Sequence, residues 1–276
     1  MFEFNFLLET NTFNHNGLDK EIICLNIERL SLLREKIYSI KESLCRNEDI
    51  YNSEIIQSKK LYEVLYDETL DRDSRIMLSN IVDKAKDNIG IEVNGNIGLN
   101  YCPNIKCIYT LEDWIKYHHE NLIINYKNES EFFLGLKRYF PNLEFHENIQ
   151  TTLNTLEGGC QNFIKDIISS LECIDIHLEN NIKSSNNLTE ALKKTSSSLG
   201  LDITLEGDAS RKRDLSFIFK DDENNDRSMY CESHVKLEKS SNPSDSSWYA
   251  NRIYFHPGID EIKSKKILIG YIGKHL

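Results

Sequence analysis

Apolar residues recur every three or four positions over most of the first 200 residues, which is the spacing of one face of an α-helix. This pattern predicts helices over 54–66 and 160–178, and another that begins near Asp73 as its N-cap. The longest apolar stripe, which predicts a core-facing helix, consists of Ile23, Ile27, Leu30, Leu33, Ile37, Ile40 and Leu44.

Capping residues mark two further helix boundaries in this region. Thr110 and Asp113 have the spacing of a capping box, in which each side chain accepts the backbone N–H of the other residue. Asn187 and Glu190 are predicted to cap a short helix, and Gly200 is predicted to end it. The region before Gly200 is therefore predicted to be mostly helical.

The period of the pattern changes from helical to alternating after Gly200. Five segments alternate or are rich in strand-forming residues, at 201–205, 214–219, 229–237, 252–255 and 266–273. Strands this close together, with no helix between them, are expected to pair as an antiparallel meander. We therefore predict an α+β fold, in which a mostly α-helical N-terminal region precedes a small C-terminal antiparallel sheet of four to five strands covered by helices. The expected domains are 1–158 and 159–276.

Charge narrows the range of functions. The chain has 33 basic and 44 acidic residues and a formal charge of −11, which argues against a generally basic nucleic-acid coat or a polybasic membrane binder. The segment from Leu201 onward has a net charge of only −1, so the first 200 residues carry −10. The acidity therefore belongs to the predicted helical region, and a compact phosphate site in the sheet remains compatible with the total.

The expected compartment is the cytoplasm, with no membrane partner. No run of 18 apolar residues occurs, and the first residues lack the pattern of a secretory signal. The seven cysteines are odd in number and scattered, which is typical of reduced thiols, and the isolated pair Cys102 and Cys107 is not expected to hold zinc. The adjacent His118 and His119 cannot share a helix face and are expected on a solvated helix edge.

The predicted sheet collects residues that could act on a phosphodiester. His234 and Lys236 lie two positions apart on one strand and share a face, and Arg252 opens the next strand. Lys274 and His275 close the last strand. RNA can be cleaved without metal when a base takes the 2′-OH proton and cations stabilise the charge that develops on the phosphate. Histidine suits the proton steps near neutral pH, and lysine and arginine suit the charge.

The segments CESHVKLE, RIYF and KILIGYIGKHL resemble the second half of the RelE/YafQ superfamily of bacterial toxin endoribonucleases. The resemblance covers roughly the last 115 residues. It implies a metal-independent endoribonuclease without a cofactor, with RNA as substrate, that acts as a toxin or as a stress or phage-defence effector. It also implies that His234 and His275 share the acid and base roles, and that Lys236, Arg252 and Lys274 stabilise phosphate charge.

Two alternatives stay open. The order Asp214, Glu232 and Lys236 is similar to the acidic and lysine pattern of restriction-type DNA nucleases, in which the two carboxylates would hold Mg²⁺. In the other alternative the chain is a non-catalytic scaffold, whose acidic helical region binds a partner protein. Within the nuclease hypothesis, the same region, 1–158, is a candidate regulatory part that restrains the sheet or binds an inhibitory partner.

Overall fold

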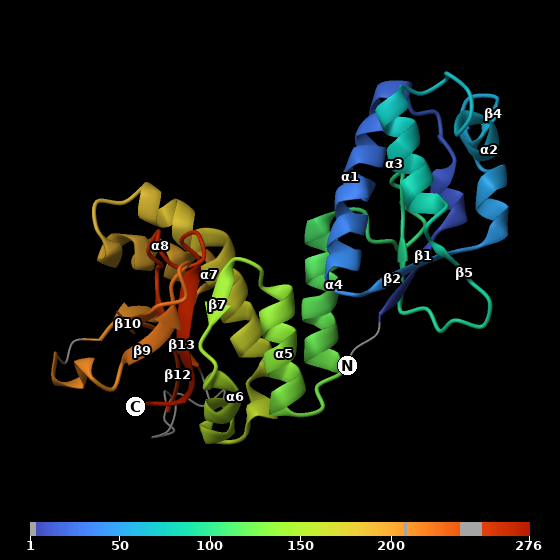
Figure 1. The fold of residues 1–276 in the computed structure, drawn as a ribbon. Helices are drawn as coiled ribbons and strands as arrows, with labels where there is room; N and C mark the ends of the chain where they lie inside the picture. The colour runs from blue at the N-terminus through green and yellow to red at the C-terminus, as the bar shows by residue number, and fades with distance from the viewer. Residues whose placement is uncertain (1–3, 207–208, 238–249) are drawn as a thin grey trace. The chain divides into compact units, whose positions relative to one another are not determined.

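The computed structural model describes residues 4–206, 209–237 and 250–276 (Figure 1). Its internal contacts divide the chain into two units, Met1–His118 and His119–Leu276, here named the N-terminal and C-terminal units. The division falls inside helix α4 (Leu111–Ile124), so the expected boundary after residue 158 lies within the C-terminal unit. The α+β class is confirmed, because the described residues form both helices and several sheets.

The N-terminal unit is built on a parallel sheet with the strand order β5-β2-β1-β6. Sequence patterning did not indicate this sheet, whose strands are too short to show a clear period. They are β1 (Asn5–Leu8), β2 (Ser43–Arg46), β5 (Lys86–Asp87) and β6 (Gly95–Ile97). The connecting elements are a 3₁₀ turn (Thr10–Phe13), α1 (Lys20–Ser39), a second 3₁₀ turn (Glu48–Asn52) and α3 (Arg72–Val82).

Three details of this unit correct the sequence predictions. The long apolar stripe ends early, because α1 stops at Ser39 and Leu44 belongs to β2. The helix predicted over 54–66 is a hairpin of β3 (Glu54–Ile56) and β4 (Lys59–Lys60) followed by the short α2 (Leu61–Val64). The cap of α3 is Asp71, whose carboxylate accepts the backbone N–H of Ser74 at 2.9 Å.

The two adjacent histidines of α4 are buried and do not form a solvated helix edge. His118 is fully buried, and its Nε2 lies 3.3 Å from the carboxylate of the equally buried Glu42, which also accepts the indole N–H of Trp114. His119 is 4% exposed and lies 2.7 Å from the carboxylate of Glu172. Neighbouring helical positions point in different directions, so the two rings enter different units. Each ring has a carboxylate partner in the unit that it enters.

The C-terminal unit contains a sheet with the order β7-β13-β12-β11-β8, in which the pairs are antiparallel except for the parallel pair of β7 and β13 (Figure 1). The strands are β7 (Leu143–Phe145), β8 (Ile203–Leu205), β11 (Ser233–Leu237), β12 (Asn251–His256) and β13 (Ile267–Lys274). The meander prediction is wrong in one respect: β9 (Ser216–Lys220) and β10 (Asp226–Tyr230) form a separate hairpin. The segment predicted as one strand over 229–237 is therefore divided between β10 and β11.

The helices that lie wholly in the C-terminal unit precede every strand of this sheet except β7, which lies between α5 and α6. They are α5 (Glu129–Tyr139), α6 (Ile149–Thr152), α7 (Ile164–Lys183) and α8 (Leu188–Leu199), with 3₁₀ turns at Leu153–Thr155, Cys160–Asn162 and Ala209–Lys212. Among the residues that the structure describes, no helix has the length and apolar character needed to span a membrane.

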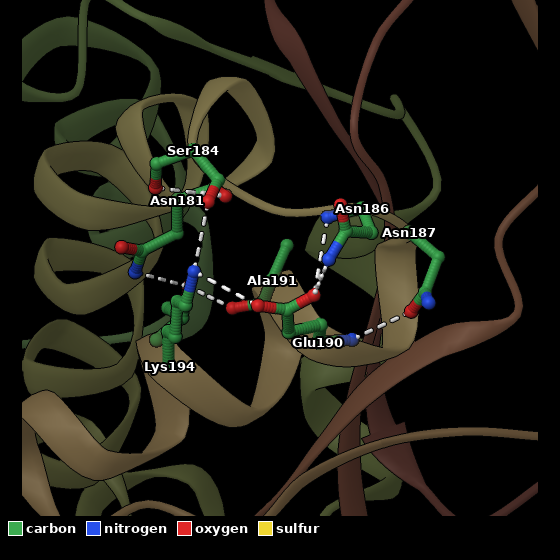
Figure 2. Close-up of polar contacts among 8 residues, drawn as sticks. Asn181, Ser184, Asn186, Asn187, Glu190, Ala191 and Lys194 are labelled. Atoms are coloured by element: carbon green, nitrogen blue, oxygen red, sulfur yellow. Dashed lines mark hydrogen bonds and ion pairs between the residues drawn. The ribbon is translucent and has the colours of Figure 1, made fainter.

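The α7–α8 hairpin is held by a polar network that begins at its caps (Figure 2). The Asn187 side chain accepts the backbone N–H of Glu190 at 2.9 Å, and Gly200 ends α8 in the left-handed conformation, as the sequence predicted. Lys194 donates to the carbonyl of Ser184 at 2.9 Å and pairs with Glu190 at 3.1 Å. These contacts fix the two helices to each other over the turn.

The two faces of the sheet differ in composition. Ile203, Val235, Ile253 and Ile272 lie opposite one another in register and form an apolar face. On the other face, Tyr254 and Tyr271 join a buried cluster with the β9–β10 hairpin, which includes Phe219 and Met229. Beyond the area that this hairpin covers, the same face carries charged residues and histidine, so it is the face that could act on a polar ligand.

Candidate functional site

His234 stands in a row of side chains that crosses the polar face of the sheet. It lies opposite Thr204 on β8 and Tyr254 on β12, and Tyr254 lies opposite Tyr271 on β13. His234 Nδ1 donates to the carbonyl of Glu232 at 3.5 Å, so Nε2 accepts from the Thr204 hydroxyl at 3.1 Å. The imidazole is 5% exposed and tilted against the Tyr254 ring, with centroids 5.3 Å apart. His234 is therefore a buried, hydrogen-bonded member of the row.

The next row brings two cations side by side. Lys236 lies opposite Arg252, and Arg252 lies opposite Gly273. Lys236 Nζ pairs with the carboxylate of Asp202 at 2.7 Å, and the Lys236 N–H donates to the Asp202 carbonyl at 3.0 Å. Arg252 is 8% exposed and donates from Nη1 to the carbonyl of Asn251 at 3.0 Å. Two of the three predicted phosphate-stabilising residues are thus neighbours on one face.

His275 reaches the same face through Arg211. Its backbone N–H donates to the carbonyl of Ala250 at 2.6 Å, which anchors the end of the chain against β12. Arg211 lies in the 3₁₀ turn Ala209–Lys212, between β8 and β9. Its Nη1 lies 3.0 Å from His275 Nε2 and 2.7 Å from the Glu206 carboxylate. Because a guanidinium can only donate, His275 Nε2 is the acceptor and its ring is neutral.

Burial favours the uncharged forms of the two histidines and of Tyr254, and the neighbouring guanidiniums add to this effect at the histidines. The pKa of His234 is lowered to about 4, chiefly by burial and with help from the positive charge of Arg252, against a hydrogen bond to the Glu232 carbonyl that raises it. Burial, Arg252 and Arg211 lower the pKa of His275, and Glu206 opposes them. Burial raises the pKa of Tyr254. At neutral pH the cluster therefore holds uncharged imidazoles and a protonated phenol.

We name these residues the sheet cluster: Asp202, Thr204, Glu206, Arg211, His234, Lys236, Arg252, Tyr254 and His275. Within the described residues it gathers three cations and two carboxylates, so positive charge is in excess although the whole chain is acidic. The exposed imidazole of His275 lies at its surface. Such a site can attract an anion and accept a proton beside it.

Of the residues selected from the sequence, His234, Lys236, Arg252 and His275 meet in the sheet cluster, and Lys274 does not. Arg252 lies opposite Gly273, so the following residue, Lys274, projects from the other face. Its Nζ lies 3.5 Å from the Glu157 carboxylate, and its side chain is 61% exposed. Strand register therefore separates Lys274 from the other four residues, and a role for Lys274 in stabilising phosphate charge stays a prediction.

The residues of the metal-dependent alternative have other surroundings. Asp214 lies in the turn before β9, and its nearest ion pair is a loose one with Arg213 at 3.8 Å. Glu232 contributes its backbone carbonyl, which accepts from Glu206 N–H at 2.8 Å. Across residues 4–206, 209–237 and 250–276, no group of three or more His, Cys, Asp and Glu side chains is arranged to hold a metal ion. The alternative stays a prediction.

Sequence reasoning missed Asp202, Thr204, Glu206, Arg211 and Tyr254 as members of the site. Tyr254 could have been found, because it follows Arg252 by two positions on a strand and so shares its face. Arg211 stands in a basic run before a predicted strand, but only the separate placement of the β9–β10 hairpin brings it to His275. No local pattern indicates that contact.

Comparisons with protein-family models, with curated proteins and with solved structures gave no match for this chain.

Proposed function

We propose that the chain is a metal-independent endoribonuclease whose active site is the sheet cluster. The observation that carries the proposal is the exposed His275 imidazole, kept neutral beside the guanidiniums of Arg211 and Arg252. A neutral imidazole is a proton acceptor, and guanidiniums bind phosphate oxygens through paired hydrogen bonds. The resemblance to toxin endoribonucleases supports the same activity and, with it, a role as a toxin or a stress or phage-defence effector.

We propose different roles for the two histidines, which the resemblance gave a shared acid and base role. His275 is the proposed base: an RNA phosphate that takes over the Arg211 hydrogen bonds releases the lone pair of His275 Nε2 for the 2′-OH proton. The 2′-oxygen then attacks phosphorus, and the 5′-oxygen leaves with a proton from water. His234, with its pKa near 4 and its buried ring, remains neutral and positions Thr204 and Tyr254.

The cations stabilise the charge that develops during the attack. Arg211 contacts the phosphate at the surface, and Arg252 and Lys236 add positive charge from the row behind it. The pair of Arg211 with Glu206 holds the guanidinium in place before RNA binds. The expected products are a 2′,3′-cyclic phosphate and a 5′-hydroxyl end.

Incubating the protein with RNA and with DNA of the same sequence, each with and without EDTA, tests this proposal. We expect RNA cleavage that survives EDTA and leaves 2′,3′-cyclic phosphate ends, and no DNA cleavage. The variant His275→Ala should lose roughly 100-fold or more in rate, the usual contribution of a general base. Because the base must be neutral and its pKa is lowered, kcat/KM should rise with pH through a midpoint below the ordinary histidine value of about 6.5 and then level off.

Lys274→Ala is the matched control, since it changes the adjacent residue on the opposite face and should leave the rate unchanged. Cleavage that EDTA abolishes and that Asp214→Ala eliminates would favour the metal-dependent alternative. RNA that stays intact under every condition would contradict the proposed activity.

A further inference from the structure

A polar cavity of about 450 Å³ lies beside the sheet cluster, between the first turns of α7, the end of α8 and the β8–β11 edge. Its volume is in the range of small-molecule sites. The polar side chains at its wall are Asp166, Ser169, Ser170, Ser196, Asp202 and Lys236. They offer carboxylate acceptors, an ammonium donor and hydroxyls that can do either, so the wall suits a ligand with both donors and acceptors.

Ser170 provides an independent indication that the cavity receives a ligand. Its side chain is 1% exposed and lines the cavity, and within the described residues its Oγ has no hydrogen-bond partner. A buried hydroxyl without a partner is unfavourable, and native structures rarely retain one without a role. Ser196, by contrast, donates its hydroxyl proton to the carbonyl of Leu201. Ser170 therefore brings an unsatisfied hydroxyl to the wall of the cavity.

The helical walls of the cavity are fixed before any ligand enters. Cys173 Sγ donates to the Thr195 carbonyl at 3.3 Å. Asn181, labelled in Figure 2, donates to the Thr195 hydroxyl at 2.9 Å, so both contacts tie α7 to α8. Gly200 turns the chain from α8 toward β8 in the left-handed conformation. A preformed pocket of this kind lowers the entropy lost on binding.

The cavity and the sheet cluster share a boundary. The ion pair of Lys236 with Asp202 lines the cavity, and Lys236 also lies opposite Arg252 in the cluster. Cross-strand neighbours are only ~5 Å apart. A nucleotide whose phosphate contacts Arg252 and Arg211 therefore has its base within reach of the cavity.

We propose that this cavity is a subsite for a nucleobase that carries an exocyclic amino group: adenine, cytosine or guanine. The inference rests on the proposed function, because it assigns the base of the same RNA. The amino group donates to the Asp166 carboxylate and the Ser170 hydroxyl, and the ring nitrogens or carbonyl accept from Lys236. The only base donor of uridine is N3–H, which lies between two carbonyl oxygens, so uracil would bring these oxygens against the carboxylates of the wall.

Saturation-transfer NMR titrations of the full chain with adenosine, cytidine, guanosine and uridine test the subsite without requiring cleavage. At least one amino-bearing nucleoside should bind tenfold or more tightly than uridine, the ratio expected for one good base contact. Ser170→Ala should weaken that binding several-fold while the melting temperature stays equal or rises, since the variant removes an unpartnered hydroxyl. Asp166→Asn should reduce the preference over uridine.

Lys274→Ala, which lies outside the sheet cluster and the cavity, is the matched control and should bind nucleosides as the wild type does. Absence of nucleoside binding, equal binding of uridine, or unchanged binding in Ser170→Ala would each overturn the subsite. RNA cleavage that persists with an unchanged base preference in Ser170→Ala would remove the subsite and leave the proposed function intact. Nucleoside binding without cleavage of any RNA would retain the subsite and remove the proposed function.

Discussion

Protonation of His234, a member of the sheet cluster, should lower the free energy of unfolding of the C-terminal unit. Its imidazole is buried and hydrogen-bonded to the Glu232 carbonyl and the Thr204 hydroxyl, and the neutral form fits this environment. Its folded-state pKa of about 4 lies below the value of about 6.5 in an unfolded chain. Between these two values the unfolded state binds more protons, so acid favours unfolding.

The variant His234→Gln should remove most of this acid sensitivity. At pH 7 His234 is mostly neutral in both the folded and the unfolded chain, so its contribution to the unfolding free energy is almost complete. As the pH falls from 6.5 toward 4, the wild type should lose about 3 kcal/mol of unfolding free energy through this residue. Urea titrations at a series of pH values measure the loss. Burial also lowers the pKa values of His146 and His256, but both remain in the variant, so the difference between the two curves isolates His234.

Parallel curves for the wild type and His234→Gln would show that His234 is not buried in its neutral form. The same result would remove the reason for denying His234 a proton-transfer role.

At the scale of elements, Gly270 decides how the β9–β10 hairpin sits on the sheet. The pairing of β12 with β13 shifts there, because Tyr254 lies opposite Tyr271 and Phe255 lies opposite Ile269, which leaves Gly270 as the extra residue of a bulge. A Cβ at position 270 would overlap the Phe217 ring and the Cys231 sulfur. The β9–β10 hairpin therefore packs directly on the backbone of Gly270. The turn that places Arg211 beside His275 leads into this hairpin.

Gly270→Ala should destabilise the chain by about 1–3 kcal/mol, the usual cost of an overpacked site. Adding Phe217→Leu should recover part of the loss, because it removes the ring atoms that the new methyl meets. Denaturant titrations of the two single variants and the double variant give the coupling between the positions. Strictly additive losses would mean that the methyl is accommodated elsewhere and that the hairpin does not rest on Gly270.

The elements differ in how far their sequences predict them. The 3.6-residue period and the caps at Thr110, Asn187 and Gly200 identify helices whose signals are local, and all three caps are confirmed. The strands of the N-terminal sheet are two to four residues long, and such short runs cannot be distinguished from helix or loop by period. The strand β7 joins β13 from a distant part of the chain, which no local pattern encodes.

The candidate site divides in the same way. Alternation along β11 and β12 predicts that His234, Lys236 and Arg252 share a face, because a strand has a fixed period of two. The contact of Arg211 with His275 depends on how a hairpin docks onto the sheet, and the opposite orientation of Lys274 depends on register. Residue type and periodicity therefore predict the row, and tertiary packing completes the cluster.

At the scale of the whole molecule, the net negative charge of the chain should repel RNA, whereas the cations of the sheet cluster should attract it. Met1–His118 has a net charge of −6 and His119–Leu276 has −5, so neither unit as a whole attracts a polyanion. Binding must then come from the few cations of the sheet cluster, Arg211, Lys236 and Arg252. A protein that neutralises two or three phosphates of a single strand releases only the counterions of those phosphates.

The salt dependence of RNA affinity measures this number directly. For 2′-O-methyl RNA, which lacks the nucleophile and stays intact, the slope of log K against log salt should lie between about −1.4 and −2.1. Arg211→Gln should make the slope shallower by about 0.7, because one phosphate contact is lost, whereas Lys274→Gln on the opposite face should leave it unchanged. A slope of −5 or steeper would mean that RNA makes many more phosphate contacts than the three cations of the sheet cluster can provide, and would exclude this cluster as the main site of contact.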